Sequence, residues 1–123
     1  LDRGDWVVCD RYIDSTYAYQ SGGREHSEKD ILDIIRLTDA IEPNMTFLLD
    51  MSPEEGLQRA KERADLDRFE NEKLVFHQRV RSAYLMCAEK NKHRFCVIPS
   101  DGRSIEDIFD MIITKIKERR QLA

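Results

Sequence analysis

The sequence of 123 residues contains only three cysteines, and no two of them have the spacing of a metal site. An odd number of widely separated cysteines also argues against a disulfide framework. Such a set is typical of reduced thiols, so we expect a cytoplasmic protein. Cys9 and Cys96 lie inside apolar runs, where a free cysteine is expected to pack as a small buried hydrophobe.

Long apolar runs and a large excess of one charge are also absent. No run approaches the ~18 apolar residues that a membrane span needs, and the first five residues do not resemble a secretory signal. The net charge is −4, from 24 acidic and 20 basic side chains. Such a sequence has no general electrostatic footprint for nucleic acid or an anionic membrane, so we expect neither partner. Any bound anion must be held by a local cluster of Arg or Lys.

Short apolar runs are present, and they alternate with helical patterns. Continuous apolar runs occupy residues 6–9, 46–49 and 95–98, and each ends at a charged or turn-forming segment. Runs of this kind are typical of strands covered on both faces, as in a parallel sheet. Ser21-Gly22-Gly23-Arg24 is interpreted as a loop between helices.

The helical patterns between these runs begin at serine caps. The spacing predicts helices from Ser27 to about Ala40, from Ser52-Pro53, over residues 74–88, and from Ser104. Strands that alternate with helices predict one α/β domain with a parallel sheet flanked by helices. The three histidines lie in polar or helical settings without evident partners, and we assign them no role.

Asp10 and Arg11 directly follow the first predicted strand. In open α/β sheets, ligands bind outside the carboxyl ends of the strands. A guanidinium suits phosphate oxygens, and a carboxylate suits Mg²⁺ or one of its waters. An ion pair at the end of the strand would explain the same two residues, and these two residues alone do not decide between the readings.

The residues that follow decide between them. Residues 10–20 (Asp-Arg-Tyr-Ile-Asp-Ser-Thr-Tyr-Ala-Tyr-Gln), with residues 22–24 (Gly-Gly-Arg), closely resemble the signature of thymidylate kinases. Residues 43–50 resemble a strand of that family, and residues 52–55 the helix start that follows it. Residues 59–70 resemble its lid, which ends in Asp-Arg-Phe-Glu. The resemblance implies that residues 1–123 are the carboxyl-terminal part of a single domain with the fold of P-loop nucleoside monophosphate kinases.

The resemblance also implies a reaction, in which the γ-phosphate of ATP is transferred to thymidine monophosphate with Mg²⁺ as cofactor. Arg11 would contact the acceptor phosphate, and Asp10 would order magnesium through water rather than bind it directly. The remaining acceptor-site residues would be Ser15, Thr16 and Gln20 at the thymine and Tyr19 against the deoxyribose.

The lid would bring arginines to the phosphates of ATP. Arg63 stands where the catalytic arginine of the lid is expected in some members of the family, Arg59 is a second candidate, and Arg68 would also reach phosphate. The alternative interpretation of these charges is a solvated helix face with local ion pairs.

No Gly-x-x-x-x-Gly-Lys-Ser/Thr motif occurs in the sequence. This loop binds phosphates through backbone N–H groups and a lysine, and in the family it precedes the Asp-Arg-Tyr strand together with a central strand of the sheet. We therefore expect residues 1–123 alone neither to adopt the family fold nor to catalyse. The alternatives for the intact protein are a deoxynucleoside kinase and a non-catalytic remnant that packs or dimerises. By resemblance the intact enzyme would be a homodimer.

Overall fold

The computed structural model describes residues 1–63 and 70–121, and for residues 63 and 70–72 it describes the backbone alone. Its elements are, in order, α1 (Ile13–Thr16), the π-helix η1 (Tyr17–Gly23), α2 (Glu28–Leu37), β1 (Thr46–Asp50), α3 (Pro53–Arg63), α4 (Glu70–Lys90), β2 (Phe95–Pro99) and α5 (Ile105–Gln121).

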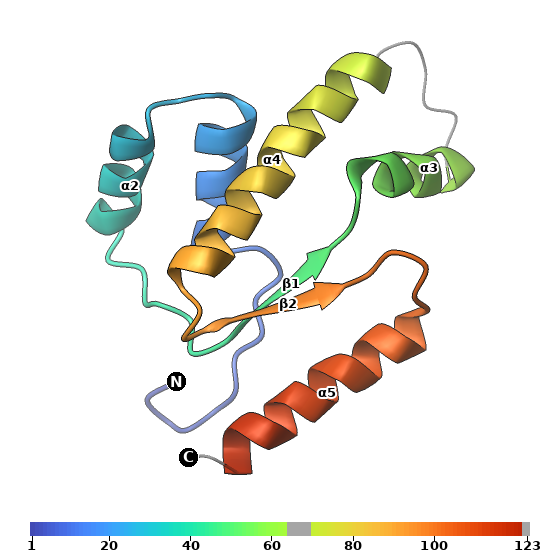
Figure 1. Cartoon of the computed structure of the whole chain (residues 1–123). Coiled ribbons are helices and arrows are strands. Elements are labelled where there is room, and N and C mark those ends of the chain that lie inside the picture. The colour runs from blue at the N-terminus through green and yellow to red at the C-terminus, as the bar shows by residue number, and fades with distance from the viewer. Residues whose placement is uncertain (64–69, 122–123) are drawn as a thin grey trace.

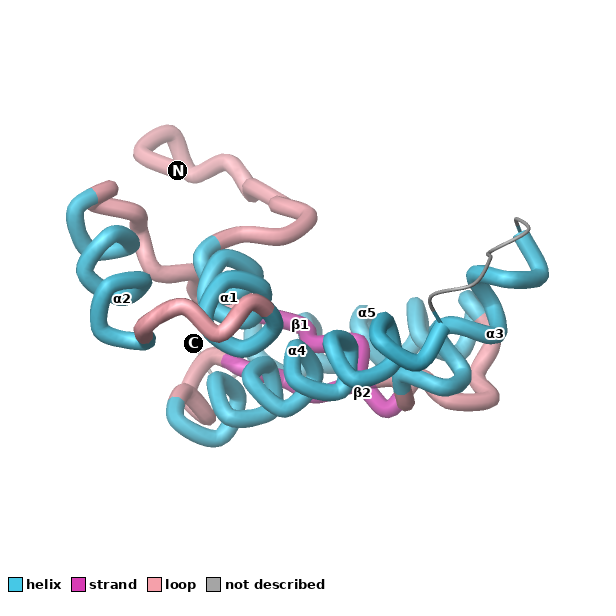
Figure 2. Tube along the Cα trace, turned by 90° about the horizontal axis from the view of Figure 1, so that it is seen from above, coloured by secondary structure: helices cyan, strands magenta, loops and turns pink. Residues whose placement is uncertain are grey.

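The strands β1 and β2 form a parallel pair, from Thr46 opposite Phe95 to Asp50 opposite Pro99. The helices α4 and α5 run along opposite sides of this pair, while α3 continues outward from the end of β1 (Figure 1). Seen from above, α2 and the N-terminal segment lie at the opposite end of the molecule from α3 (Figure 2). The predicted parallel sheet flanked by helices is therefore confirmed, with two strands in the described residues.

Residues 6–9 do not form a strand, so this part of the sequence prediction is wrong. Val8 is 94% exposed, and Trp6 and Val7 are exposed as well. A strand forms only beside a partner that satisfies its backbone N–H and C=O groups. In the family that the sequence resembles, another strand separates this segment from β1, and the described residues contain no such strand. Cys9 is consequently exposed. The prediction that it packs in the core is therefore wrong.

Three helices begin at the serines that the sequence predicts as caps. The Ser27 hydroxyl accepts a hydrogen bond from the backbone N–H three residues later at 3.4 Å, as does Ser52 at 3.4 Å and Ser104 at 3.1 Å. Each hydroxyl satisfies a backbone donor that has no partner within the helix. The cap predictions are therefore confirmed. They could be made from the sequence because each cap depends on only a few neighbouring residues.

The core lies where α1 and η1 pack against α4. Ala18 is fully buried, and the other core residues are Tyr17, Ile31, Val80 and Ala83. Ser21, Gly22 and Gly23 belong to η1, which corrects their interpretation as a loop. A Cβ atom at Gly22 would lie 2.5 Å from the Cβ of Ala83, and one at Gly23 would lie 2.6 Å from the Phe76 ring. The two glycines therefore let η1 approach α4 closely.

Gly22→Ala is expected to destabilise the protein by about 1–3 kcal/mol, because overpacking displaces well-packed neighbours. The new methyl would meet the Cβ of Ala83 and, at 3.1 Å, the carbonyl oxygen of Arg79, and neither atom moves without the α4 backbone. Urea unfolding measures the change. Gly56→Ala in α3 is the matched control, since its Cβ would meet only the sulfur of Met51 at 3.9 Å. That control should raise stability by about 0.5–1 kcal/mol. Equal effects of the two variants would contradict the close packing.

Candidate functional site

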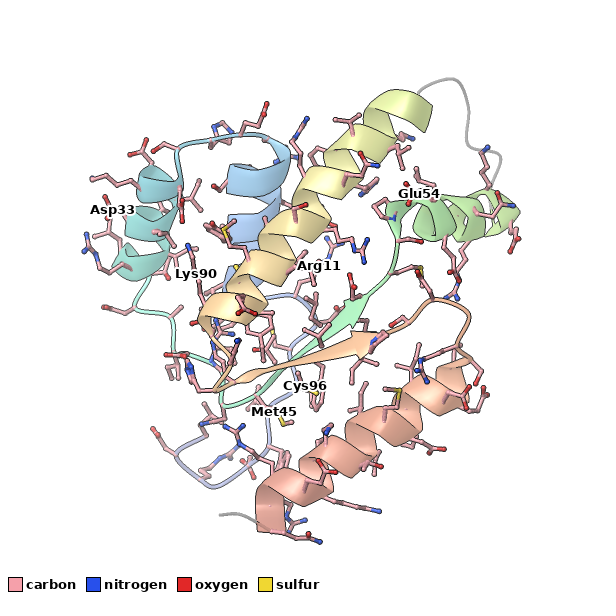
Figure 3. All side chains as sticks on the ribbon, viewed as in Figure 1. Arg11, Asp33, Met45, Glu54, Lys90 and Cys96 are labelled. Atoms are coloured by element: carbon pink, nitrogen blue, oxygen red, sulfur yellow. The ribbon has the colours of Figure 1, made fainter. Side chains whose placement is uncertain are left out.

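Arg11 and Tyr19 form the centre of the predicted acceptor site. The Arg11 Nη2 donates a hydrogen bond to the Tyr19 hydroxyl at 2.9 Å, and the guanidinium carbon lies 4.8 Å from the centroid of the Tyr19 ring. Arg11 is exposed, and in the view of Figure 3 it is labelled beside α4. The Arg11 guanidinium has no other hydrogen-bond or ion-pair partner among the described residues. The other guanidinium N–H groups are therefore available to an anion.

The backbone at Arg11 is in the left-handed region, with φ of 62°. This conformation costs a residue with a side chain roughly 1–2 kcal/mol and persists where the surroundings hold it. Here the side chain is held by Tyr19, eight residues later. The arrangement fixes the direction of the Arg11 guanidinium.

The alternative of an ion pair between Asp10 and Arg11 is not what the structure shows, because Arg11 binds an aromatic hydroxyl instead. Asp10 is exposed and has no ion-pair partner among the described residues. Its carboxylate is a hard oxygen donor of the kind that Mg²⁺ takes. No group of three or more His, Cys, Asp or Glu able to hold a metal occurs in the described part of the chain. Asp10 therefore offers one carboxylate of a kind that fits magnesium.

The three residues predicted at the thymine lie on α1 and η1 but differ in their contacts. The Ser15 hydroxyl shares a hydrogen bond with the Tyr84 hydroxyl of α4. Thr16 is exposed and has no side-chain partner in the described ranges. The Gln20 Oε1 accepts a hydrogen bond from Arg24 at 3.0 Å, which leaves the Gln20 side-chain NH₂ group as a donor. Ser15 is thus joined to the Arg11–Tyr19 centre through Tyr84.

Aromatic rings from α4 fix the Tyr19 side chain. The Phe76 ring lies 6.0 Å from the Tyr19 ring, and the Tyr84 ring lies 6.3 Å away with an interplanar angle of 84°. His77 packs edge-on against Phe76 at 5.4 Å, and burial lowers its pKa. The sequence predicts α4 but gives no sign that its rings face the acceptor site.

The predicted lid is described only in part. The Arg59 Nη2 donates to Glu55 Oε1 at 2.6 Å, and the same oxygen accepts from the N–H of Gly102 at 3.1 Å. In this conformation Arg59 forms the ion pair along a helix face that the alternative interpretation predicts. Arg63 is the last residue of α3 and its side chain lies outside the described residues, as does the whole of Arg68. The roles assigned to Arg63 and Arg68 stay predictions.

Two carboxylates at the carboxyl end of the strand pair accept hydrogen bonds from groups that the sequence does not reveal as their partners. Asp50, the last residue of β1, accepts hydrogen bonds from Arg81 of α4 at 2.8 and 3.0 Å, and these bonds raise the pKa of Arg81. Asp101 accepts from the N–H of Ser52 at 3.0 Å, which lowers the pKa of Asp101. The signal in the sequence is a carboxylate close behind each apolar run, since Asp50 directly follows residues 46–49 and Asp101 follows residues 95–98 after a proline and a serine.

The other end of the strands carries a buried ion pair that the sequence does not reveal. Arg94 is 5% exposed and donates to both carboxylate oxygens of Asp14, at 2.8 and 2.9 Å, and to the Thr46 hydroxyl at 2.9 Å. Its Nε lies 3.1 Å from Glu42 Oε1 without forming a hydrogen bond. His93 lies 2.7 Å from the same Glu42 oxygen, which corrects the prediction that the histidines lack partners.

One hollow in the described surface lies away from these residues. It has a volume of about 440 Å³ and lies between η1, α2 and α4, where Tyr17, Glu28, Arg79 and Met86 are among its lining residues. None of the predicted acceptor-site residues lines it. The predicted acceptor-site residues therefore lie outside this hollow. No helix in the described ranges has the length and apolar character of a bilayer span.

Comparison with known proteins points to one family. The family model described as thymidylate kinase matches residues 1–112. The thymidylate kinase of Teredinibacter turnerae is 48% identical over 99 residues, which cover 80% of this chain and 48% of that protein. That of Chromohalobacter salexigens is 44% identical over 122 residues, covering 97% of this chain and 57% of the relative.

A solved structure agrees with these relatives. The crystal structure of thymidylate kinase from Ehrlichia chaffeensis superposes with a TM-score of 0.72 at 27% identity, covering 94% of this chain and 53% of that one. The chain therefore spans about half the length of the curated relatives it matches.

Proposed function

Because this chain belongs to the thymidylate kinase family, we propose that the intact protein phosphorylates thymidine monophosphate with ATP and releases thymidine diphosphate and ADP. The intact protein here means the complete polypeptide in which residues 1–123 occur. The single observation that carries the proposal is the exposed Arg11 guanidinium, held on the Tyr19 ring and hydroxyl with its other donors available. The chain has the P-loop kinase fold of the family.

Phosphoryl transfer requires positioning of the two substrates and neutralisation of phosphate charge more than covalent help from the protein. Arg11 supplies a fixed positive charge and a planar set of donors for the acceptor phosphate. Tyr19 reduces the freedom of that side chain before substrate arrives, since it contacts the guanidinium through both its ring and its hydroxyl. Magnesium, when bound with ATP, would neutralise phosphate oxygens, with Asp10 ordering its waters.

The same segment supplies groups for the nucleoside. The NH₂ group of Gln20 and the hydroxyls of Ser15 and Thr16 can donate to the carbonyl oxygens of thymine, and these hydroxyls can also accept. The Gln20 NH₂ has no acceptor among the described residues. The Tyr19 ring is large and held by Phe76 and Tyr84, so it would pack against the deoxyribose.

The ATP side of the reaction requires groups beyond those described. We propose Arg63 as the catalytic arginine of the lid, with Arg68 as a further phosphate ligand. Arg59 could reach phosphate only by leaving Glu55, to which it is bonded at 2.6 Å. Residues 1–123 contain no phosphate-binding loop, so the proposed activity assigns that loop to another part of the intact protein. We also propose that the intact protein is a homodimer and acts in the cytoplasm.

A coupled assay of ADP release tests this function. The intact protein with ATP and Mg²⁺ should release ADP when thymidine monophosphate is added and show only background release with thymidine, because Arg11 needs a phosphate to bind. Residues 1–123 alone should show no turnover with either substrate. Faster turnover with thymidine would replace the proposal by a deoxynucleoside kinase. No turnover of the intact protein with either acceptor would favour the non-catalytic remnant.

A further inference from the structure

Tyr84 of α4 contacts two separate elements of the acceptor site. Its hydroxyl shares a hydrogen bond with Ser15 of α1, across 69 residues of sequence. The Tyr84 and Tyr19 rings meet at 6.3 Å in an edge-to-face arrangement. Phe76 also touches Tyr19, but of the residues that the structure describes only Tyr84 joins Tyr19 to Ser15.

The hydrogen bond between Tyr84 and Ser15 restricts where the Ser15 hydroxyl points. A serine hydroxyl on a free side chain rotates among several positions and can donate or accept. Tyr84 is partly buried, and a buried tyrosine hydroxyl usually has a partner. Burial also raises the pKa of Tyr84, so the hydroxyl stays protonated at neutral pH. Ser15 is therefore held by a group that keeps its proton.

The contact between Tyr84 and Tyr19 restricts the other half of the site. Edge-to-face packing fixes the plane of the Tyr19 ring, and that ring and its hydroxyl hold Arg11. Tyr84 thus supports Ser15 directly and Arg11 through Tyr19. In the proposed reaction Ser15 faces the base of thymidine monophosphate, and Arg11 faces the phosphate of the same molecule.

We propose that Tyr84 is a positioning residue that sets the affinity of this site for thymidine monophosphate and leaves the affinity for ATP unchanged. The inference rests on the proposed function, because it takes the substrate of Ser15, Tyr19 and Arg11 to be the acceptor nucleotide. Tyr84 itself touches no substrate in this assignment. Its effect is exerted through the orientation of these three side chains.

Tyr84→Phe in the intact protein is the first test, because it removes the hydroxyl and keeps the ring. We expect KM for thymidine monophosphate to rise about three- to tenfold, because one hydrogen bond is lost. KM for ATP should change less than about twofold. Tyr84→Leu also removes the ring, so it should raise KM further and lower kcat as Arg11 loses its fixed direction. Tyr84→Phe should therefore have a lower KM for thymidine monophosphate and a higher kcat than Tyr84→Leu.

Tyr17→Phe is the matched control. The Tyr17 hydroxyl donates to Glu28 at 3.1 Å and, like that of Tyr84, has a pKa raised by burial, to about 12. Tyr17 lies on η1, as Tyr19 does, and its hydroxyl bonds to none of the acceptor-site residues in the described part of the chain. A purely structural loss of one tyrosine hydroxyl would change both variants alike. We expect Tyr17→Phe to leave both KM values unchanged.

A double-mutant cycle with Ser15→Ala provides an independent measurement. If Tyr84 acts through Ser15, adding Tyr84→Phe to Ser15→Ala should raise KM for thymidine monophosphate no further. Equal changes in both KM values, a KM for thymidine monophosphate unaltered in Tyr84→Phe, or additive effects in the cycle would overturn the inference. Failure of the wild-type protein to turn over thymidine monophosphate would instead remove the proposed function, so the two failures are distinguishable.

Discussion

Arg11→Ala is expected to abolish nearly all turnover of the intact protein, a fall in kcat/KM of about 10²-fold or more, because the acceptor phosphate loses the guanidinium that positions it. The side chain offers a guanidinium already oriented by Tyr19, with a hydrogen bond of 2.9 Å and a ring contact of 4.8 Å. Alanine supplies neither charge nor donor. The coupled assay of ADP release with thymidine monophosphate measures the loss.

Two further substitutions at this position separate charge from geometry. Arg11→Lys keeps the charge but not the planar fork, so its activity should lie between those of wild type and Arg11→Ala. Arg11→Gly should be as inactive as Arg11→Ala but more stable than it by roughly 1–2 kcal/mol, because φ at this position is 62° and only glycine adopts it without strain. Urea unfolding of the two variants compares them directly.

Arg36→Ala is the control for removing an arginine. Arg36 lies on the exposed side of α2 and pairs with Asp33 three residues earlier, away from Arg11. Its loss should leave kcat and both KM values unchanged. Full activity of Arg11→Ala would remove the role assigned to Arg11 and favour a non-catalytic protein.

The elements that the sequence predicts well are those whose signals are local. The serine caps at Ser27, Ser52 and Ser104 bond residues three positions later, so each start can be recognised from a few residues. Residues 6–9 show the limit of this approach. Their apolar run looks the same as those of β1 and β2, but a strand also needs a neighbour, which a local pattern does not contain.

The residues of the candidate site also differ in how far the sequence alone reveals them. Arg11, Ser15 and Tyr19 lie on one short stretch of chain, and the sequence alone groups them because residues 10–20 resemble the family signature. Tyr84 is 69 residues from Ser15, and its apolar ring made it look like an ordinary core position. For Arg59 the sequence supports two interpretations, because the same charges suit a lid and a helix face. Only the bond to Glu55 shows which of the two this conformation adopts.

Asp14→Ala is expected to destabilise the protein by about 3–5 kcal/mol, because it leaves the buried guanidinium of Arg94 without its carboxylate. Arg94 is 5% exposed and donates to both oxygens of Asp14. Asp33→Ala is the matched control. It removes exposed pairs with Lys29 and Arg36 and should cost less than about 1 kcal/mol.

The double variant Asp14→Leu with Arg94→Met decides what the pair contributes. It removes both charges and fills the space with apolar groups, so it should be clearly more stable than Asp14→Ala alone. A cost below about 1 kcal/mol for Asp14→Ala would mean that Glu42, whose Oε1 lies 3.1 Å from the Arg94 Nε, can serve as the partner instead.

The position of Asp14 extends the prediction from stability to the site. Asp14 directly precedes Ser15 on α1, and Arg94 directly precedes β2 while also bonding Thr46 at the start of β1. The pair therefore fixes α1, and with it Ser15, relative to the strands, while Tyr84 fixes it relative to α4. At temperatures where Asp14→Ala remains folded, we expect its KM for thymidine monophosphate to rise and its KM for ATP to stay unchanged. Unchanged values for both substrates in the folded variant would show that Tyr84 alone suffices to place α1.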